Sequence, residues 1–299
     1  MKNIKLLFLT GLLFLFISGI YRHDTPVEQY LSLAKESRFD CVGQILTYQD
    51  NKWKKGASCV FIGDKFVLSA VHVFIETDTT PDTMQINGQT VIVYVPYNER
   101  IADISKLFFM FNGIKYKGKR LIIHPNYLDS LTKGSCDIAL IELEKEVKGI
   151  SFPFLNKEFN ELGDTVTGVG FGVSGLANRP DLVGPYGLKI AGQNIIDSIG
   201  GYQVNNNRAL LFADFDSPIE YEGCNKMGDS KPLPLEYIPS GGDSGGGLFR
   251  EKNNKLDLIG ITTGSGVDLN ILLKSGYYCQ INSWTRISVF YEWIEQNIK

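Results

Sequence analysis

Histidine is scarce in this chain, and neither sign of charge is in large excess. Only 3 of the 299 residues are His, and 30 Lys and Arg stand against 33 Asp and Glu, for a formal net charge of −3. With so few His and no Cys pair at the spacing of metal ligands, a structural zinc site is not indicated. Without a basic excess there is no electrostatic basis for nucleic-acid binding. We expect no metal, no cofactor and no nucleic-acid partner.

One acidic segment leaves an alternative open. The stretch Asp214–Glu222, with Asp229 shortly after it, is rich in the oxygen ligands that Ca²⁺ takes. Its spacing matches no EF-hand loop, and a charged run of this kind is typically a solvated loop. Calcium therefore stays an alternative to the metal-free protein that we expect.

Long apolar runs, repeats and low-complexity segments are also missing. Hydrophobic residues make up 43% and charged residues 21% of the chain, which is typical of a folded globular protein. The apolar run Leu6–Ile20 is shorter than the ~20 residues that a membrane helix needs. Lys2 and Lys5 precede it and the small pair Ser18-Gly19 lies near its end. This pattern predicts a cleaved signal peptide over residues 1–19, with an uncleaved anchor as the alternative.

Export determines what we expect of the cysteines and of the location. The mature protein would be secreted or periplasmic, with no stable membrane association after signal cleavage. In an oxidising compartment, one or two disulfides are expected, with one thiol left over, and the sequence does not assign the pairs. The five cysteines are Cys41, Cys59, Cys136, Cys224 and Cys279.

Short β-strand signals dominate the chain after a brief lead-in at residues 20–36. Runs rich in Val, Ile, Phe and Thr, such as Cys41–Tyr48 and Thr90–Val95, are separated by Gly, Asp, Asn or Pro. Many short strands at regular spacing are typical of an all-β sandwich or barrel. The strand-poor stretch around residues 144–163 divides the chain into two halves, 37–150 and 151–299.

Two segments have a helical pattern instead. The lead-in is predicted to be helical around Val27–Leu33. At the other end, apolar residues recur at helical spacing over Ile287–Lys299, which predicts an amphipathic helix packed on the β body.

Three short segments carry residues suited to nucleophilic catalysis. Ser244 lies in the glycine-rich turn Ser240–Gly247, His72 follows a strand, and Asp137 begins an apolar strand. Successive N–H groups of a glycine-rich turn can converge on an oxyanion. A nucleophilic Ser needs a base such as His, and the His needs an acceptor to hold its tautomer. Each residue alone fits an ordinary turn, a packed His or a strand cap, but their combination and order favour a catalytic triad.

These segments resemble the signature motifs of the chymotrypsin/trypsin-like serine proteases. The resemblance covers roughly residues 40–299 and implies two six-stranded antiparallel Greek-key barrels with a C-terminal helix and a cleft between the barrels. The motifs are Leu68–His72, Asp137–Leu140 and Gly242–Gly246, supported by Ile123–Tyr127, Gly168–Gly172, Trp284–Ser288 and Tyr291–Ile294.

The resemblance also implies a role for each matched residue. Ser244 would be the nucleophile, His72 the general base and then acid, and Asp137 the residue that orients the His. The backbone N–H groups of Gly242 and Ser244 would form the oxyanion hole. The implied function is a secreted serine endopeptidase, probably monomeric in family terms and acting on protein or peptide substrates through an acyl-enzyme. The alternative is a catalytically silent protease-like binding module.

The chain departs from the family at the loops that hold the site. Val73 and Ser240 stand where many members have Cys, so two common disulfides do not carry over. In the family, the residue matching Asp243 pairs with an amino terminus created by zymogen cleavage, and no matching cleavage segment exists here. The hypothesis is that a terminus at Ile20, or the side chains of Arg22 or His23, partners Asp243. The alternative is that residues 20–36 are a disordered lead-in or propeptide.

The resemblance gives a partial prediction of substrate specificity. Ile238 stands six residues before Ser244, where trypsin-like members carry Asp. An apolar pocket floor would leave a bound cation unpaired, so we expect poor cleavage after Lys or Arg. Thr263 falls near a substrate-backbone contact on one pocket wall, and Asn282 on the other wall narrows the pocket. Small to medium apolar side chains are the predicted preference.

Overall fold

The fold is described from a computed structural model of the full chain. The described residues are 8–10, 19–49, 52–86, 89–183, 187–219, 227–228, 231–266 and 276–299. The chain divides into two compact units, one of residues 1–15 with Phe74–Asp103 and one of Phe16–Val73 with Ile104–Lys299. The larger unit contains all the predicted site residues.

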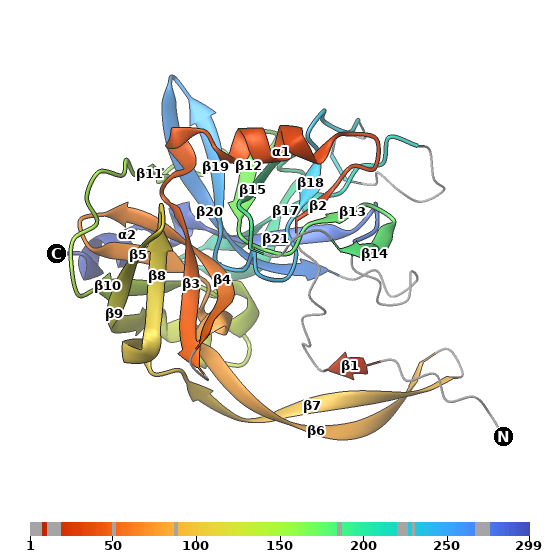
Figure 1. The fold of residues 1–299 in the computed structure, drawn as a ribbon, viewed down its shortest axis with the longest axis horizontal. Helices are drawn as coiled ribbons and strands as arrows, with labels where there is room; N and C mark the ends of the chain where they lie inside the picture. Colours follow the sequence, from red (N-terminus) through yellow and green to blue (C-terminus); the bar gives the residue numbers. More distant parts are fainter. Residues whose placement is uncertain are drawn as a thin grey trace. The chain divides into compact units, whose positions relative to one another are not determined.

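The first half of the larger unit is a closed six-stranded barrel with antiparallel neighbours in the order β10-β5-β4-β3-β8-β9 (Figure 1). Strand β8 shows why it closes: Leu107, Phe109 and Phe111 alternate with less buried residues and point to the core. The first predicted barrel is therefore confirmed. Its strands are β3 (Val42–Gln49), β4 (Lys52–Gly63), β5 (Phe66–Ser69), β8 (Leu107–Phe111), β9 (Ile114–Ile123) and β10 (Ala139–Leu143).

The second half differs from its prediction. Its described strands form an eight-stranded sheet in the order β15-β12-β19-β20-β21-β17-β16, with β11 added parallel to β20, and not a second closed six-stranded barrel. The strands are β11 (Phe154–Leu155), β12 (Thr165–Gly170), β15 (Ile190–Ile195), β16 (Ser198–Val204), β17 (Asn207–Asp214), β19 (Gly247–Lys252), β20 (Lys255–Gly266) and β21 (Ile281–Arg286).

The reason lies at the edges of this sheet. The chain passes from β15 directly into β16, which forms a hairpin with β17, so β15 and β16 end at opposite edges. Near β15, the side chain of Asn194 donates to Asp214 O at 2.9 Å and to Tyr237 O at 3.3 Å. Side-chain bonds of this kind take the place of a backbone ladder. One face of the sheet still buries an apolar core that includes Leu211, Leu248 and Trp284.

The C-terminal helix is confirmed as α2 (Ile287–Asn297). It is anchored at its start by Glu161, which is fully buried and accepts bonds from Arg286 at 2.5 and 3.1 Å and from Ser288 Oγ at 2.8 Å. Asn156 donates to the same carboxylate at 2.9 Å. This network ties residues 156–161, between the two halves, to the last strand and helix.

Replacing Glu161 with Ala is expected to destabilise the fold by about 3–5 kcal/mol, because it leaves the buried Arg286 guanidinium without its carboxylate. Glu158, whose side chain is exposed and pairs with Lys252 at 3.4 Å, is the matched control, and Glu158→Ala should change stability little. Urea unfolding of both variants measures the difference. Equal effects of the two substitutions would contradict this account of the crossover.

Residues 20–36, for which a disordered lead-in was one alternative, are structured. Strand β2 (Ile20–Tyr21) lies between β13 (Gly175–Leu176), to which it is parallel, and β18 (Tyr237–Ile238), to which it is antiparallel. β14 (Arg179–Val183) completes this four-stranded sheet. Helix α1 (Val27–Ala34) follows near β15, as Figure 1 shows, and its buried Tyr30 donates to Glu236 O at 3.0 Å. The lead-in is therefore part of the second half's packing.

The smaller unit is a long β-hairpin. β6 (Ile75–Ile86) pairs antiparallel with β7 (Gln89–Ile101), and β1 (Phe8–Thr10) lies parallel to β7. The predicted strand Thr90–Val95 falls within β7 and therefore outside the barrel. The remaining short elements are the 3₁₀ turns η1 (Ser37–Phe39), η2 (Val71–Phe74), η3 (Ile104–Lys106), η4 (Pro125–Leu128) and η5 (Lys133–Ser135).

Three cysteines are buried free thiols, namely Cys41, Cys59 and Cys136. Burial raises the pKa of the Cys41 thiol to about 12 and that of Cys136 to about 11. Only Cys224 and Cys279 are left for the predicted disulfides, and Cys224 lies outside the described residues. Within the described part of the chain, we find no helix that is both long and apolar enough to span a membrane.

Candidate active site

The structure brings three of the predicted site residues into direct contact. The carboxylate of Asp137 accepts the backbone N–H of His72 at 2.9 Å through Oδ1 and lies 2.5 Å from His72 Nδ1 through Oδ2. Thr263 Oγ1 donates to the same Oδ2. Asp137 comes directly before β10, His72 lies in η2 just after β5, and Thr263 lies on β20. Because β5 and β10 are paired, their ends hold the His and the Asp together.

The electrostatics of Asp137 suit the role of a charged acceptor. Burial by itself would raise the pKa of this carboxyl, but the facing His72 and the hydrogen bonds from His72 and Thr263 outweigh it and hold the pKa below its usual value. An ionised Asp137 makes Nδ1 of His72 the donor, which leaves Nε2 as the basic nitrogen. The ring is therefore held in the tautomer that general-base catalysis requires.

The loop around Ser244 is tightly packed on the first barrel. Gly242 and Gly245 have φ values of 95° and 81°, which favour glycine, and a Cβ on Gly245 would collide with Ser69 and with Ser58 O. Gly245 N–H donates to Thr262 O at 2.8 Å. Thr262 precedes Thr263, so this bond places the serine loop beside the strand that contacts Asp137.

Two backbone donors of this loop are available for a ligand. Among the described residues, no acceptor is bonded to the N–H groups of Gly242 and Ser244, the two predicted oxyanion-hole donors. Ser244 itself is half-buried. Its Oγ forms no hydrogen bond with Nε2 of His72 in this structure. Catalytic hydrogen bonds of this type are often long before substrate binds.

Asp243 has only donors around its carboxylate. It accepts the N–H groups of Gly172 at 2.8 Å and of Ser240 at 3.0 Å, and also bonds the Tyr237 hydroxyl and the N–H of Gly19. Burial raises the pKa of Asp243 to about 6, although these donors act in the opposite direction. The carboxylate therefore lies at a junction between the serine loop, the end of β12 and the start of the lead-in.

The hypothesis about the partner of Asp243 needs a correction. Arg22 bonds Asp24 and Leu233 O, and His23 bonds the hydroxyl of Tyr278 at 2.8 Å. Ile20 is buried in the core beside β13 and β18. The contact from the lead-in is made by Gly19, one residue earlier than proposed. A backbone N–H has no signature in the sequence, which is why this partner was missed.

The predicted pocket residues are all buried or half-buried. Ile238 packs in an apolar cluster with Ile20, Phe215 and Tyr278. Asn282 is fully buried, and neither of its amide atoms has a hydrogen-bond partner among the described residues. Of the predicted wall residues, Thr263 also contacts Asp137. The assignment of Ile238 and Asn282 to a specificity pocket stays a prediction.

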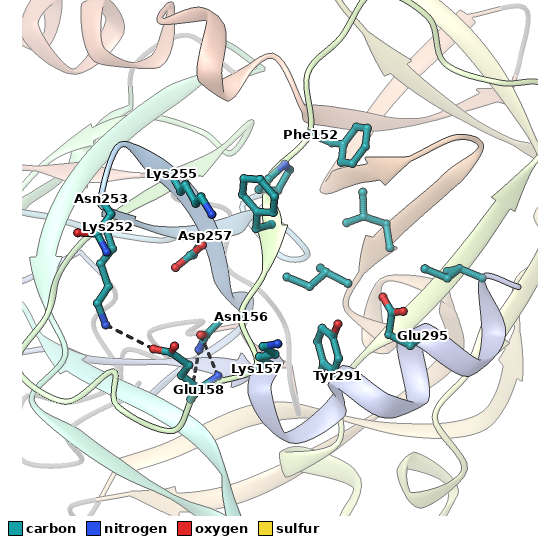
Figure 2. Close-up of a pocket in the computed structure, with 15 residues that line it drawn as sticks. Phe152, Asn156, Lys157, Glu158, Lys252, Asn253, Lys255, Asp257, Tyr291 and Glu295 are labelled. Atoms are coloured by element: carbon teal, nitrogen blue, oxygen red, sulfur yellow. Dashed lines mark hydrogen bonds and ion pairs between the residues drawn. The ribbon is translucent and has the colours of Figure 1, made fainter.

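A separate pocket of about 610 Å³ was not anticipated from the sequence. It lies between β11, the β19–β20 turn and α2, and Figure 2 shows Phe152, Tyr291 and Glu295 at its sides with Lys252 paired to Glu158. None of the predicted catalytic residues lines it. Scattered single residues from distant segments form this pocket, so no local motif marks it.

No family model matches the chain, and no curated protein sequence is significantly similar to it. Over the described part of the chain, no group of three or more His, Cys, Asp or Glu is arranged to hold a metal ion. Much of the alternative calcium segment, residues 220–226 with 229 and 230, lies outside that part. The function must therefore be argued from the site itself.

Proposed function

We propose that this protein is a secreted or periplasmic serine endopeptidase of the chymotrypsin/trypsin-like type that cleaves protein or peptide substrates. One observation carries the proposal: the buried Asp137 bonds both the backbone N–H and Nδ1 of the same His72. A structural His needs one partner, whereas a double hold fixes the position and the tautomer of the ring. The finer fold proposal, a second barrel that encloses the other side of the site, rests on the resemblance alone.

The chemistry follows from these residues. His72 takes the proton of Ser244 Oγ through Nε2 as the oxygen attacks the substrate carbonyl. The carbonyl oxygen becomes an oxyanion that the N–H groups of Gly242 and Ser244 stabilise. His72 then protonates the leaving amine, and water repeats the sequence in reverse to release the acyl group. Asp137 stabilises the imidazolium in both halves. No metal or cofactor enters this scheme, and a monomer supplies every group.

Labelling of the purified mature protein with a fluorophosphonate probe tests the proposal. The wild type should be labelled, and Ser244→Ala and His72→Ala should not. Ser240→Ala is the matched control from the same loop and should keep its labelling. Folded wild type that stays unlabelled, with or without the leader, would refute the enzyme and favour the silent binding module, since the triad alone would then lack an activated serine.

Substrates with Lys or Arg before the scissile bond should be poor. Lysine and norleucine peptides that are otherwise identical make a matched pair, because the side chains differ in charge and not greatly in length. An apolar pocket around Ile238 would leave the lysine cation unpaired, so hydrolysis should be at least about 100-fold slower for lysine. Equal kcat/KM for the two peptides would rule out Ile238 as the pocket floor.

A further inference from the structure

Ser58, a fully buried residue of β4, links the first barrel to the serine loop. Its Oγ donates to Gly242 O at 2.8 Å and accepts the N–H of Phe171 at 2.8 Å. Its backbone N–H donates to Ser244 O at 2.9 Å. One residue therefore holds the carbonyl groups of both residues whose N–H groups are the proposed oxyanion-hole donors.

The contact at Gly242 acts where the loop is conformationally soft. Gly242 has a φ of 95°, and glycine has the widest choice of backbone dihedrals. The peptide between Gly242 and Asp243 is held at both polar atoms: its oxygen by Ser58, and its N–H by Ser240 O at 2.9 Å. Without the Ser58 hydroxyl, the oxygen would lose its only protein donor among the described residues, and the peptide could rotate.

We propose that Ser58 is a positioning residue for the oxyanion hole. Its hydroxyl fixes the Gly242 peptide so that the N–H of Gly242 stays aimed at the developing oxyanion. This inference rests on the proposed protease activity. It concerns a residue on the opposite barrel from Ser244, and a hydroxyl that takes no part in proton transfer.

The test separates the maximal labelling rate from probe binding. Fluorophosphonate labelling is followed against probe concentration and pH for the wild type, Ser58→Ala and Ser69→Ala. Ser69 is the matched control, since it is also a fully buried β-strand serine and its Oγ donates to Ser58 O at 2.9 Å, leaving the Gly242 carbonyl untouched. Ser58→Ala should lower the maximal rate by about 10- to 100-fold, below the full loss of an oxyanion donor. Probe affinity should not change, and Ser69→Ala should stay within about threefold of the wild type.

The pH profile distinguishes positioning from a general distortion. The midpoint of the rate profile reports the titration of His72, which Asp137 and not Ser58 holds, so the midpoint of Ser58→Ala should match the wild type. A shifted midpoint, or equal losses in Ser58→Ala and Ser69→Ala, would overturn the inference and leave the protease proposal intact. A wild type that is never labelled would overturn both.

A second pair of variants covers the case in which Ser58→Ala does not fold. Ser58→Cys and Ser69→Cys keep a donor of similar reach, but a thiol donates weakly. The Ser58→Cys variant should have a reduced maximal rate, between the wild type and a variant without a donor, while Ser69→Cys should not. Equal rates in these two variants would contradict the positioning role.

Discussion

Asp137→Asn is expected to lower the labelling rate and the hydrolysis rate by about 10⁴-fold, the loss seen when the triad acid of such enzymes is replaced by its amide. In the wild type, both oxygens of Asp137 accept from His72, and Oδ2 also accepts from Thr263. An amide has only one oxygen. If that oxygen keeps the backbone N–H, the new NH₂ faces Nδ1 of His72, which must then accept. The proton moves to Nε2, and His72 can no longer take the proton of Ser244.

Thr263→Val is the control for this prediction. It removes one hydrogen bond to Asp137 and leaves the carboxylate, and with it the tautomer of His72, unchanged. Its rate should fall by about 10-fold or less, in line with a single lost hydrogen bond. Circular dichroism and thermal unfolding check that both variants are folded. An Asp137→Asn protein that stays within about 10-fold of the wild type would show that the pair is structural.

The parts of the fold that were predictable have strong local patterns. Apolar residues at helical spacing predicted the helix that became α2, and alternation in segments such as Leu107–Phe111 predicted barrel strands. The contact of His72 with Asp137 could be expected because both motifs resemble those of one protease family. Each of these signals lies within a few consecutive residues.

The parts that were missed depend on contacts between distant segments. Thr90–Val95 has the composition of a buried strand but pairs in the long hairpin, since β propensity does not specify a partner. Ser58 is an ordinary strand serine until the serine loop packs on it. The openness of the second sheet depends on where β15 and β16 end, and the side-chain bonds of Asn194 at that edge carry no periodic signal.

A chain that begins at Gly19 is expected to be labelled at least as fast as the full chain, whereas a chain that begins at Thr25 should lose about 100-fold or more. The shorter chain lacks the Gly19 donor to Asp243 and the buried Ile20, which joins β13 to β18. Loss of that buried side chain alone costs about 2–5 kcal/mol. Asp243 adjoins Ser244, so disorder at this junction should reach the oxyanion hole.

The decisive comparison is between chains that begin at Gly19 and at Ile20, which differ by one residue. In the full chain, burial raises the pKa of Asp243 to about 6, above its usual 3.8, so this group stabilises the fold at low pH and that stability is lost as the pH rises through 6. A free amino group on Gly19 would place a cation beside the carboxylate, lower its pKa and reverse this trend. The free energy of unfolding of the Gly19 chain, relative to the full chain, should therefore increase between pH 5 and pH 7. The Ile20 chain should show no such increase, and identical pH dependence of the two trimmed chains would exclude Gly19 as the partner of Asp243.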